Sequence, residues 1–228
     1  MSGYTILGMP YEVFILRIPA ILFALTIHEV AHGWAALKLG DPTARDEGRI
    51  TLNPISHLDP LGTLMLMTGL FGWAKPVPVN GYNLRNPKRD IMLVSFAGPL
   101  SNILQAVFFG LIIRGLVAFS PGYFETAVGQ HVLMFLILAF SINCGLAFFN
   151  LLPLYPLDGS KIVAGFLPDR HIPAYMNATR HALPIIFGLV IFGAFTGRNI
   201  LSSILGPIFK PFMYFMQLIT FGDGSAIF

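Results

Sequence analysis

The sequence predicts an all-α polytopic membrane protein with five or six transmembrane segments and a small re-entrant β-hairpin. Hydrophobic residues make up 55% of the 228 residues and charged residues only 11%, a composition unlike that of soluble globular proteins. Residues 91–113 and 126–157 contain no Asp, Glu, Lys or Arg, whereas a helix needs about 20 apolar residues to span a bilayer. These two stretches are therefore predicted to be transmembrane helices.

Five spans are expected along the chain, which we interpret as a single membrane-embedded domain over residues 1–228. The first span resembles a signal peptide, but no small-residue cleavage site follows it, so we expect it to remain uncleaved. The last two spans have the least support as membrane helices, because charged residues and prolines interrupt them: Arg198, Pro207, Lys210 and Pro211. The expected spans are residues 14–38, 91–118, 131–152, 183–197 and 199–221.

The strand and re-entrant region is expected over residues 48–80. Residues 48–54 resemble a short strand, and prolines at positions 76 and 78 exclude a helix over residues 73–80. Residues 60–74 include three glycines and are too few for a confident crossing. Because irregular backbone at membrane depth must face protein or a water-filled cavity, we expect this hairpin to lie near the active site.

The distribution of Lys and Arg predicts an orientation. Residues 38–90 and 158–182 carry most of the basic loop residues, whereas residues 118–130 carry none. By the positive-inside rule the first two regions are cytoplasmic, the third is external and the N-terminus is outside. The same clustering beside spans explains the net charge of +3, so we expect no nucleic-acid partner and the lipid bilayer as surroundings.

An HExxH motif lies at the end of the first span, with His28, Glu29 and His32. Side chains four residues apart project from one helix face, so both imidazoles can bind one zinc ion while Glu29 reaches a water molecule beside it. Ionisable residues within an apolar helix are unfavourable by roughly 2.5–3.5 kcal/mol each when charged, and they usually mark a function. The alternative is a polar helix end at the membrane interface.

A catalytic zinc site needs a third protein ligand. Asp158 is the acidic residue at the inner end of the uncharged stretch 126–157. The alternative is that Asp158 and Gly159 form only a turn after the prolines at 153 and 156. The predicted orientation favours the ligand, because it brings Asp158 and the HExxH motif to the cytoplasmic side at similar depth.

Four ordered motifs carry a resemblance to a known family. They are the HExxH at residues 28–32, the loop at residues 39–45 and 48–62, a GxxxN sequence at residues 98–102, and the segment from Asn150 to Gly159. Together they resemble the site-2 protease family of intramembrane zinc metalloproteases, in its short prokaryotic form without PDZ or CBS domains. The resemblance covers most of the chain.

The resemblance implies a zinc-dependent intramembrane endopeptidase with one Zn²⁺ held by His28, His32 and Asp158. It implies Glu29 as the general base and Asn150 as the residue that holds the substrate backbone or stabilises the oxyanion. The GxxxN glycine and asparagine are interpreted as packing residues. The implied partner is a single-pass transmembrane protein substrate, in the membrane of a prokaryotic cell.

Other interpretations stay open at this point. A non-proteolytic relative would bind transmembrane helices and zinc without cleaving, and a transporter would be expected to show internal repeats, which the sequence lacks. His57 and Asp59 are candidates for a second metal site, although turn and capping roles suit them better. A homodimer, the substrate and the gating of access are left undecided.

Overall fold

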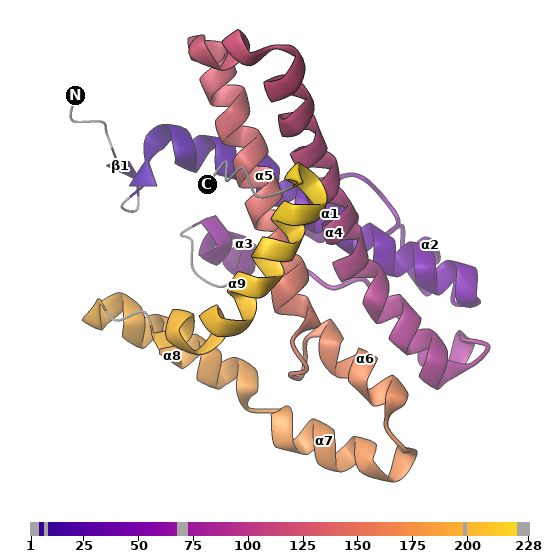
Figure 1. The fold of residues 1–228 in the computed structure, drawn as a ribbon. Helices are drawn as coiled ribbons and strands as arrows, with labels where there is room; N and C mark the ends of the chain where they lie inside the picture. The colour runs from indigo at the N-terminus through magenta and orange to yellow at the C-terminus, as the bar shows by residue number, and fades with distance from the viewer. Residues whose placement is uncertain (1–4, 7–8, 68–72, 198–199, 223–228) are drawn as a thin grey trace.

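The structure is a computed structural model of the chain, and it describes residues 5–6, 9–67, 73–197 and 200–222 (Figure 1). Within these residues, five helical segments are long and apolar enough to cross a membrane. They are α1 (Tyr11–Leu39), α4 (Pro87–Phe119), α5 (Ala127–Leu151), a segment from Asp169 to Gly193, and α9 (Ile200–Phe221). The prediction of a helical multi-pass membrane protein is confirmed, at the lower of the two expected numbers of spans.

The shorter elements connect these spans. A two-residue antiparallel pair, β1 (Thr5–Ile6) and β2 (Met9–Pro10), precedes α1. The segment from Asp169 to Gly193 contains α7 (Ile172–Thr179) and most of α8 (Ala182–Thr196). The remaining elements are α2 (Thr43–Asp46), η1 (Pro54–His57), α3 (Pro60–Met67), η2 (Gly81–Asn83), η3 (Pro121–Glu125), α6 (Asp158–Phe166) and η4 (Asp169–His171).

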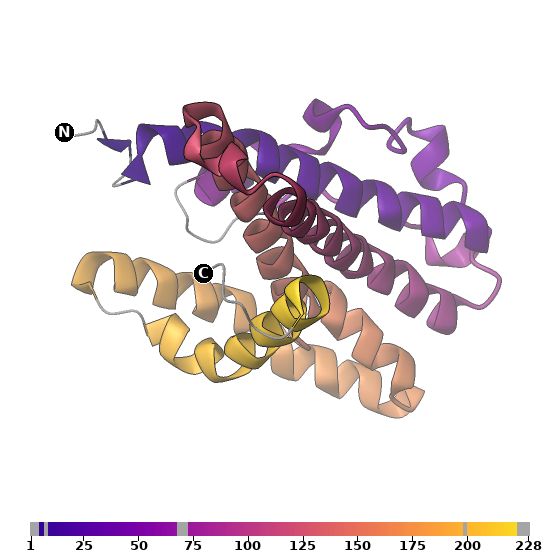
Figure 2. The ribbon, with the colours of Figure 1, turned by 45° about the horizontal axis from the view of Figure 1, so that its top comes forward.

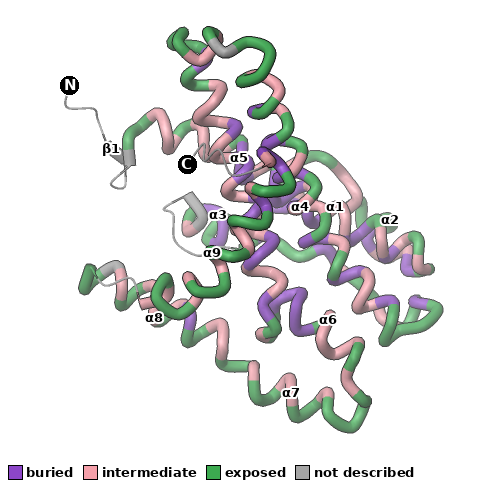
Figure 3. Tube along the Cα trace, viewed as in Figure 1, coloured by how far each residue is buried: buried purple, intermediate pink, exposed green. Residues whose placement is uncertain are grey.

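Helices α1, α4 and α5 form the centre of the molecule, and α1 and α4 lie side by side along much of their length (Figure 2). Alanines at positions 20, 106 and 139 are at most 1% exposed, and such small residues let helix backbones approach closely within a bilayer. Phe140 and Ile113 fill the space between α4, α5 and α9. Residues buried in the structure are concentrated where these helices meet (Figure 3).

The predicted β-hairpin is wrong for the described part of residues 48–80. Residues 48–53 contain a turn and two bends but no strand, and Asn53 Oδ1 accepts from the Ile55 N–H at the start of η1. Asp59 Oδ1 accepts from the Gly62 N–H, so Asp59 and Pro60 start helix α3. Short polar side chains compete in this way with strand pairing. Residues 73–80 contain no helix, and Ala74 forms an isolated bridge with Leu58. Residues 68–72 of the predicted re-entrant segment lie outside the described residues.

Helix α1 ends at Gly40, which has φ +114° and donates its N–H to the last turn. Only glycine adopts this conformation without strain. The next residue, Asp41, is fully buried and accepts hydrogen bonds from Thr43, from the Asn80 N–H and from the Asn83 side chain. Asp41 therefore fastens residues 80–83 to the end of α1.

Candidate metal centre

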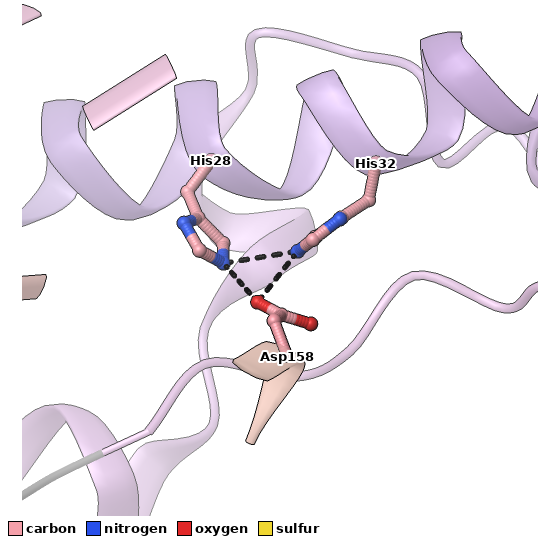
Figure 4. A group of neighbouring side chains, drawn as sticks. All are labelled: His28, His32 and Asp158. Carbon is pink, nitrogen blue, oxygen red and sulfur yellow. Dashed lines mark hydrogen bonds and ion pairs between the residues drawn. The ribbon is translucent and has the colours of Figure 1, made fainter. Parts of the chain in front are cut away.

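Three potential metal ligands meet inside the bundle, and they come from two elements (Figure 4). His28 and His32 project from one face of α1, and Asp158 lies in the first turn of α6. The two Nε2 atoms are 3.0 Å apart, and Asp158 Oδ2 lies 3.4 Å from His28 Nε2 and 3.2 Å from His32 Nε2. All three residues are buried. The structure thus brings together the three residues that the sequence selected as ligands.

The other ring nitrogens define the chemistry of this group. His28 Nδ1 lies 2.6 Å from Asn102 Oδ1, and His32 Nδ1 lies 2.7 Å from the Val94 carbonyl oxygen. Both partners are acceptors, so each Nδ1 donates, and in a neutral imidazole this leaves the lone pair on Nε2. Two Nε2 atoms and a carboxylate oxygen then converge on one point, where they could bind one cation. Two imidazoles and one carboxylate form a ligand set of catalytic zinc, so these residues fit the metal.

Helix α4 approaches the imidazoles at Gly98. A Cβ atom at this position would lie 2.3 Å from His32 Nε2 and 2.7 Å from His28 Cε1. Both distances are shorter than any real Cβ contact, so a side chain here would displace the imidazoles. Gly98 is therefore more than a helix-packing residue, because its lack of a side chain makes room for the two imidazoles.

Glu29 faces residues 73–80 across the same site. Its Oε2 accepts a 2.9 Å hydrogen bond from the backbone N–H of Val77. Glu29 itself is only 7% exposed. Residue types gave no indication of this contact, since the donor is a backbone group. Because the donor is a backbone N–H, every residue except proline at position 77 can hold this carboxylate oxygen in place.

A single cleft contains all five predicted site residues, including Asn150. Asn150 donates from Nδ2 to the Leu146 carbonyl oxygen at 3.1 Å, within its own helix α5. The cleft walls are largely apolar, and they include Trp73, Val79, Phe149 and Leu183. Asn150 therefore lines the same cleft as the candidate metal centre, among walls suited to an apolar chain.

The second candidate metal site has a different role in the structure. Asp59 caps α3, and the His57 Nε2 atom lies 2.8 Å from the Thr51 carbonyl oxygen. Among the described residues, the group that could hold a metal consists of His28, His32 and Asp158. His57 and Asp59 thus organise the loop before α3.

Comparisons with known proteins decide the family. The chain is 37% identical over 232 residues to YwhC of Bacillus subtilis (strain 168), provisionally named a zinc metalloprotease, with 92% of this chain and 97% of that protein covered. Residues 113–193 match the family model described as peptidase family M50. The chain belongs to peptidase family M50. This confirms the resemblance to site-2 proteases, so the protein is a zinc metalloprotease with several membrane-spanning helices.

Two further relatives are similar to this M50 protein. Rip2 of Mycobacterium tuberculosis (strain ATCC 35801 / TMC 107 / Erdman) is 31% identical over 199 residues, which cover 84% of this chain and 72% of Rip2. MJ0611 of Methanocaldococcus jannaschii is 28% identical over 151 residues, which cover 66% of this chain and 70% of MJ0611. Both are also provisionally named zinc metalloproteases. No solved structure matches the chain.

Proposed function

We propose that this M50 protein is an intramembrane endopeptidase that cuts a peptide bond in or near the transmembrane segment of a single-pass membrane protein. The observation that carries the proposal is the convergence of His28, His32 and Asp158 beside Glu29, in an apolar-walled cleft among membrane-spanning helices. His28, His32 and Asp158 would hold one zinc ion. When bound, zinc supplies Lewis-acid activation of a water molecule and of the peptide carbonyl.

Glu29 is the proposed general base. Its Oε2 is held by the Val77 N–H, so Oε1 is the oxygen that takes a proton from the attacking water. The same carboxyl group then delivers that proton to the leaving amine nitrogen. A base held by a backbone contact needs no reorientation between these two steps.

Asn150 is the proposed contact for the substrate backbone. One of its amide hydrogens is used by the Leu146 carbonyl, and the second remains available to a peptide carbonyl or to the oxyanion. The apolar walls beside it favour a substrate segment taken from the membrane. Because the carbonyls of a transmembrane helix are already hydrogen-bonded, the segment must unwind locally before it can bind there.

The proposed location is a prokaryotic cell membrane, with the site toward the cytoplasmic side. Lys88 Nζ donates to the Leu167 carbonyl oxygen and pairs with Asp169 at 2.7 Å, joining the two basic regions at one end of α4. The connection η3, which contains no Lys or Arg, lies at the other end of α4. This arrangement supports the orientation inferred from the positive-inside rule.

The test compares purified wild type with Glu29→Gln for bound zinc and for cleavage of a model transmembrane substrate. We expect equal zinc in both, with cleavage reduced about 100- to 10,000-fold in Glu29→Gln, because the general base is lost. Glu12→Gln is the matched control, since Glu12 lies in the first turn of the same helix, away from the site. Equal cleavage by wild type and Glu29→Gln would refute the assignment of the base.

The same experiment separates proteolysis from helix binding. A wild-type protein that holds zinc, binds the model transmembrane segment and leaves it intact would be a zinc-binding membrane protein without protease activity. A wild-type protein that lacks zinc would overturn the site assignment itself.

A further inference from the structure

Two buried asparagines connect the candidate metal centre to the middle of α5. Asn102 on α4 and Asn143 on α5 are both 0% exposed. Asn102 Oδ1 lies 2.6 Å from His28 Nδ1, and Asn102 Nδ2 donates to Asn143 Oδ1 at 2.8 Å and to the Ala24 carbonyl oxygen at 3.2 Å. Asn143 Nδ2 donates to the Ala139 carbonyl oxygen at 2.9 Å. These bonds run from α5 through α4 to the HExxH motif on α1.

Backbone carbonyls determine which atom donates and which accepts in each of these hydrogen bonds. A carbonyl oxygen only accepts, so the Asn143 atom that faces Ala139 must be Nδ2, and its Oδ1 must face Asn102. The Asn102 atom that faces Ala24 and Asn143 must likewise be Nδ2, which turns Oδ1 toward His28. Reversing either amide would place two acceptors together inside the bundle, where an unpaired polar group is strongly unfavourable.

The orientation of the Asn102 amide decides which ring nitrogen of His28 donates a hydrogen bond. Because Asn102 Oδ1 can only accept, His28 Nδ1 donates, and in the neutral imidazole this leaves the lone pair on Nε2, toward His32 and Asp158. His32 reaches the same state by a simpler route, since its Nδ1 donates to the Val94 backbone carbonyl. One imidazole is thus oriented by backbone and the other by side chains from two neighbouring helices.

We infer that Asn143 and Asn102 form a positioning relay that holds His28 in the tautomer and orientation that bind zinc. The inference rests on the proposed function in taking His28 as a zinc ligand. Both asparagines are fully buried and neither is among the residues that line the cleft, so both act through His28. Groups that orient a metal-bound histidine typically change metal affinity by about 10- to 100-fold when they are removed.

Polar residues between membrane helices also serve simply to hold the helices together. That role predicts that zinc affinity follows stability in every variant. The relay predicts that zinc affinity and stability change independently, because Asn143 influences zinc binding only through Asn102. A double variant makes this distinction, since replacing both partners by apolar side chains leaves neither amide unpaired.

The experiment measures the dissociation constant for zinc, by chelator competition, and the unfolding temperature of the metal-free chain in detergent. We expect Asn102→Leu to weaken zinc binding by about 10- to 100-fold, and Asn143→Leu to weaken it by less, since the Ala24 carbonyl still holds the Asn102 amide. The double variant should bind zinc as weakly as Asn102→Leu while being at least as stable as either single variant.

Asn143→Asp is the conservative variant. A protonated aspartic acid offers one accepting oxygen to Asn102 and one hydroxyl to the Ala139 carbonyl, so we expect it to restore the zinc affinity that Asn143→Leu loses. Failure of Asn143→Asp to bind zinc better than Asn143→Leu would overturn the part of Asn143 in the relay.

Cleavage assays on the same samples keep this inference separate from the proposed function. Wild-type zinc affinity in Asn102→Leu, in an enzyme that cleaves, would overturn the relay and leave the protease assignment standing. Weakened zinc binding in Asn102→Leu, in a protein whose wild type binds zinc but cuts no transmembrane substrate, would support the relay and refute the proposed intramembrane cleavage.

Discussion

The central helices and the C-terminal helices of this M50 protein are built differently. α1, α4 and α5 bury alanines, glycines and polar side chains against one another, and they carry four of the five site residues. In α9 the buried side chains include Met216, whereas α8 is apolar around its whole surface and largely exposed. Close packing is therefore concentrated around the candidate metal centre, whereas the C-terminal helices leave most of their surface exposed.

The sharpest test of this difference is Gly98→Ala against Gly115→Ala, both on α4. A Cβ at position 98 would overlap the imidazole of His32, whereas a Cβ at position 115 has no atom within 4 Å. We expect Gly98→Ala to lose zinc and to lower cleavage at least about 100-fold, since small displacements of catalytic groups have effects of this size. Gly115→Ala should keep both properties. Equal loss in the two variants would show that α4 tolerates no added side chain for reasons unrelated to the site.

The next largest effect concerns the contact between Val77 and Glu29, the proposed general base. Val77→Pro removes the N–H that donates a hydrogen bond to Glu29. The flanking prolines at 76 and 78 indicate that the extended backbone tolerates another proline. A hydrogen bond to a charged group contributes about 1.5–3 kcal/mol, so we expect kcat to fall about 10- to 100-fold with zinc content retained. Val77→Ala keeps the N–H and serves as the control. Equal kcat in the two variants would show that this N–H does not help Glu29.

A smaller, pH-dependent effect is expected at Asp41, which fastens residues 80–83 to α1. Burial raises the pKa of the Asp41 carboxyl, but hydrogen bonds from Thr43, Asn83 and the Asn80 N–H outweigh it and hold that pKa below its ordinary value. The carboxylate therefore stabilises the fold fully above the ordinary pKa of about 3.9, and this contribution is lost as the pH falls through the lowered pKa.

The matching variants are Asp41→Asn and Asp46→Asn. At neutral pH we expect Asp41→Asn to lower the free energy of unfolding by about 1.5–3 kcal/mol, and the difference from wild type should shrink below about pH 4. Asp46 has an exposed side chain paired with Arg45, so Asp46→Asn should change stability by about 0.5 kcal/mol or less. Unfolding in detergent across this pH range measures both. A difference that stays constant with pH would contradict the part played by the Asp41 charge.

The smallest effects on zinc binding are expected in the C-terminal helices, whichever side of the helix is changed. Met216 is 0% exposed and Tyr214 is 61% exposed, two positions away on α9. We expect Met216→Ala to destabilise by about 2–5 kcal/mol through the cavity it leaves, and Tyr214→Ala by about 0.5 kcal/mol or less. Both should keep zinc. Loss of zinc in Tyr214→Ala would show that the two regions are coupled more tightly than their packing indicates.

The sequence predicted the spans better than the region between them. Long uncharged stretches leave little choice other than a membrane helix, so the ranges expected for α1, α4 and α5 agree with the structure to within a few residues. Residues 60–74 gave no such constraint, because a short apolar run with glycines suits a strand or a helix. One feature of the sequence does favour a helix there, because Asp59 followed by Pro60 is a typical helix start.

The sequence by itself determined the part of the site that is local. His28 and His32 share a helix face because residues four apart always do, and Glu29, next to His28 in the chain, lies at the side of that face. Only the tertiary structure decided which distant groups meet them. Asp158, the Val77 N–H and the Asn102 amide reach the motif because α4, α5 and α6 pack against α1. A backbone donor and the direction of an amide depend on neighbours across the bundle, and no pattern of residue types along the chain records them.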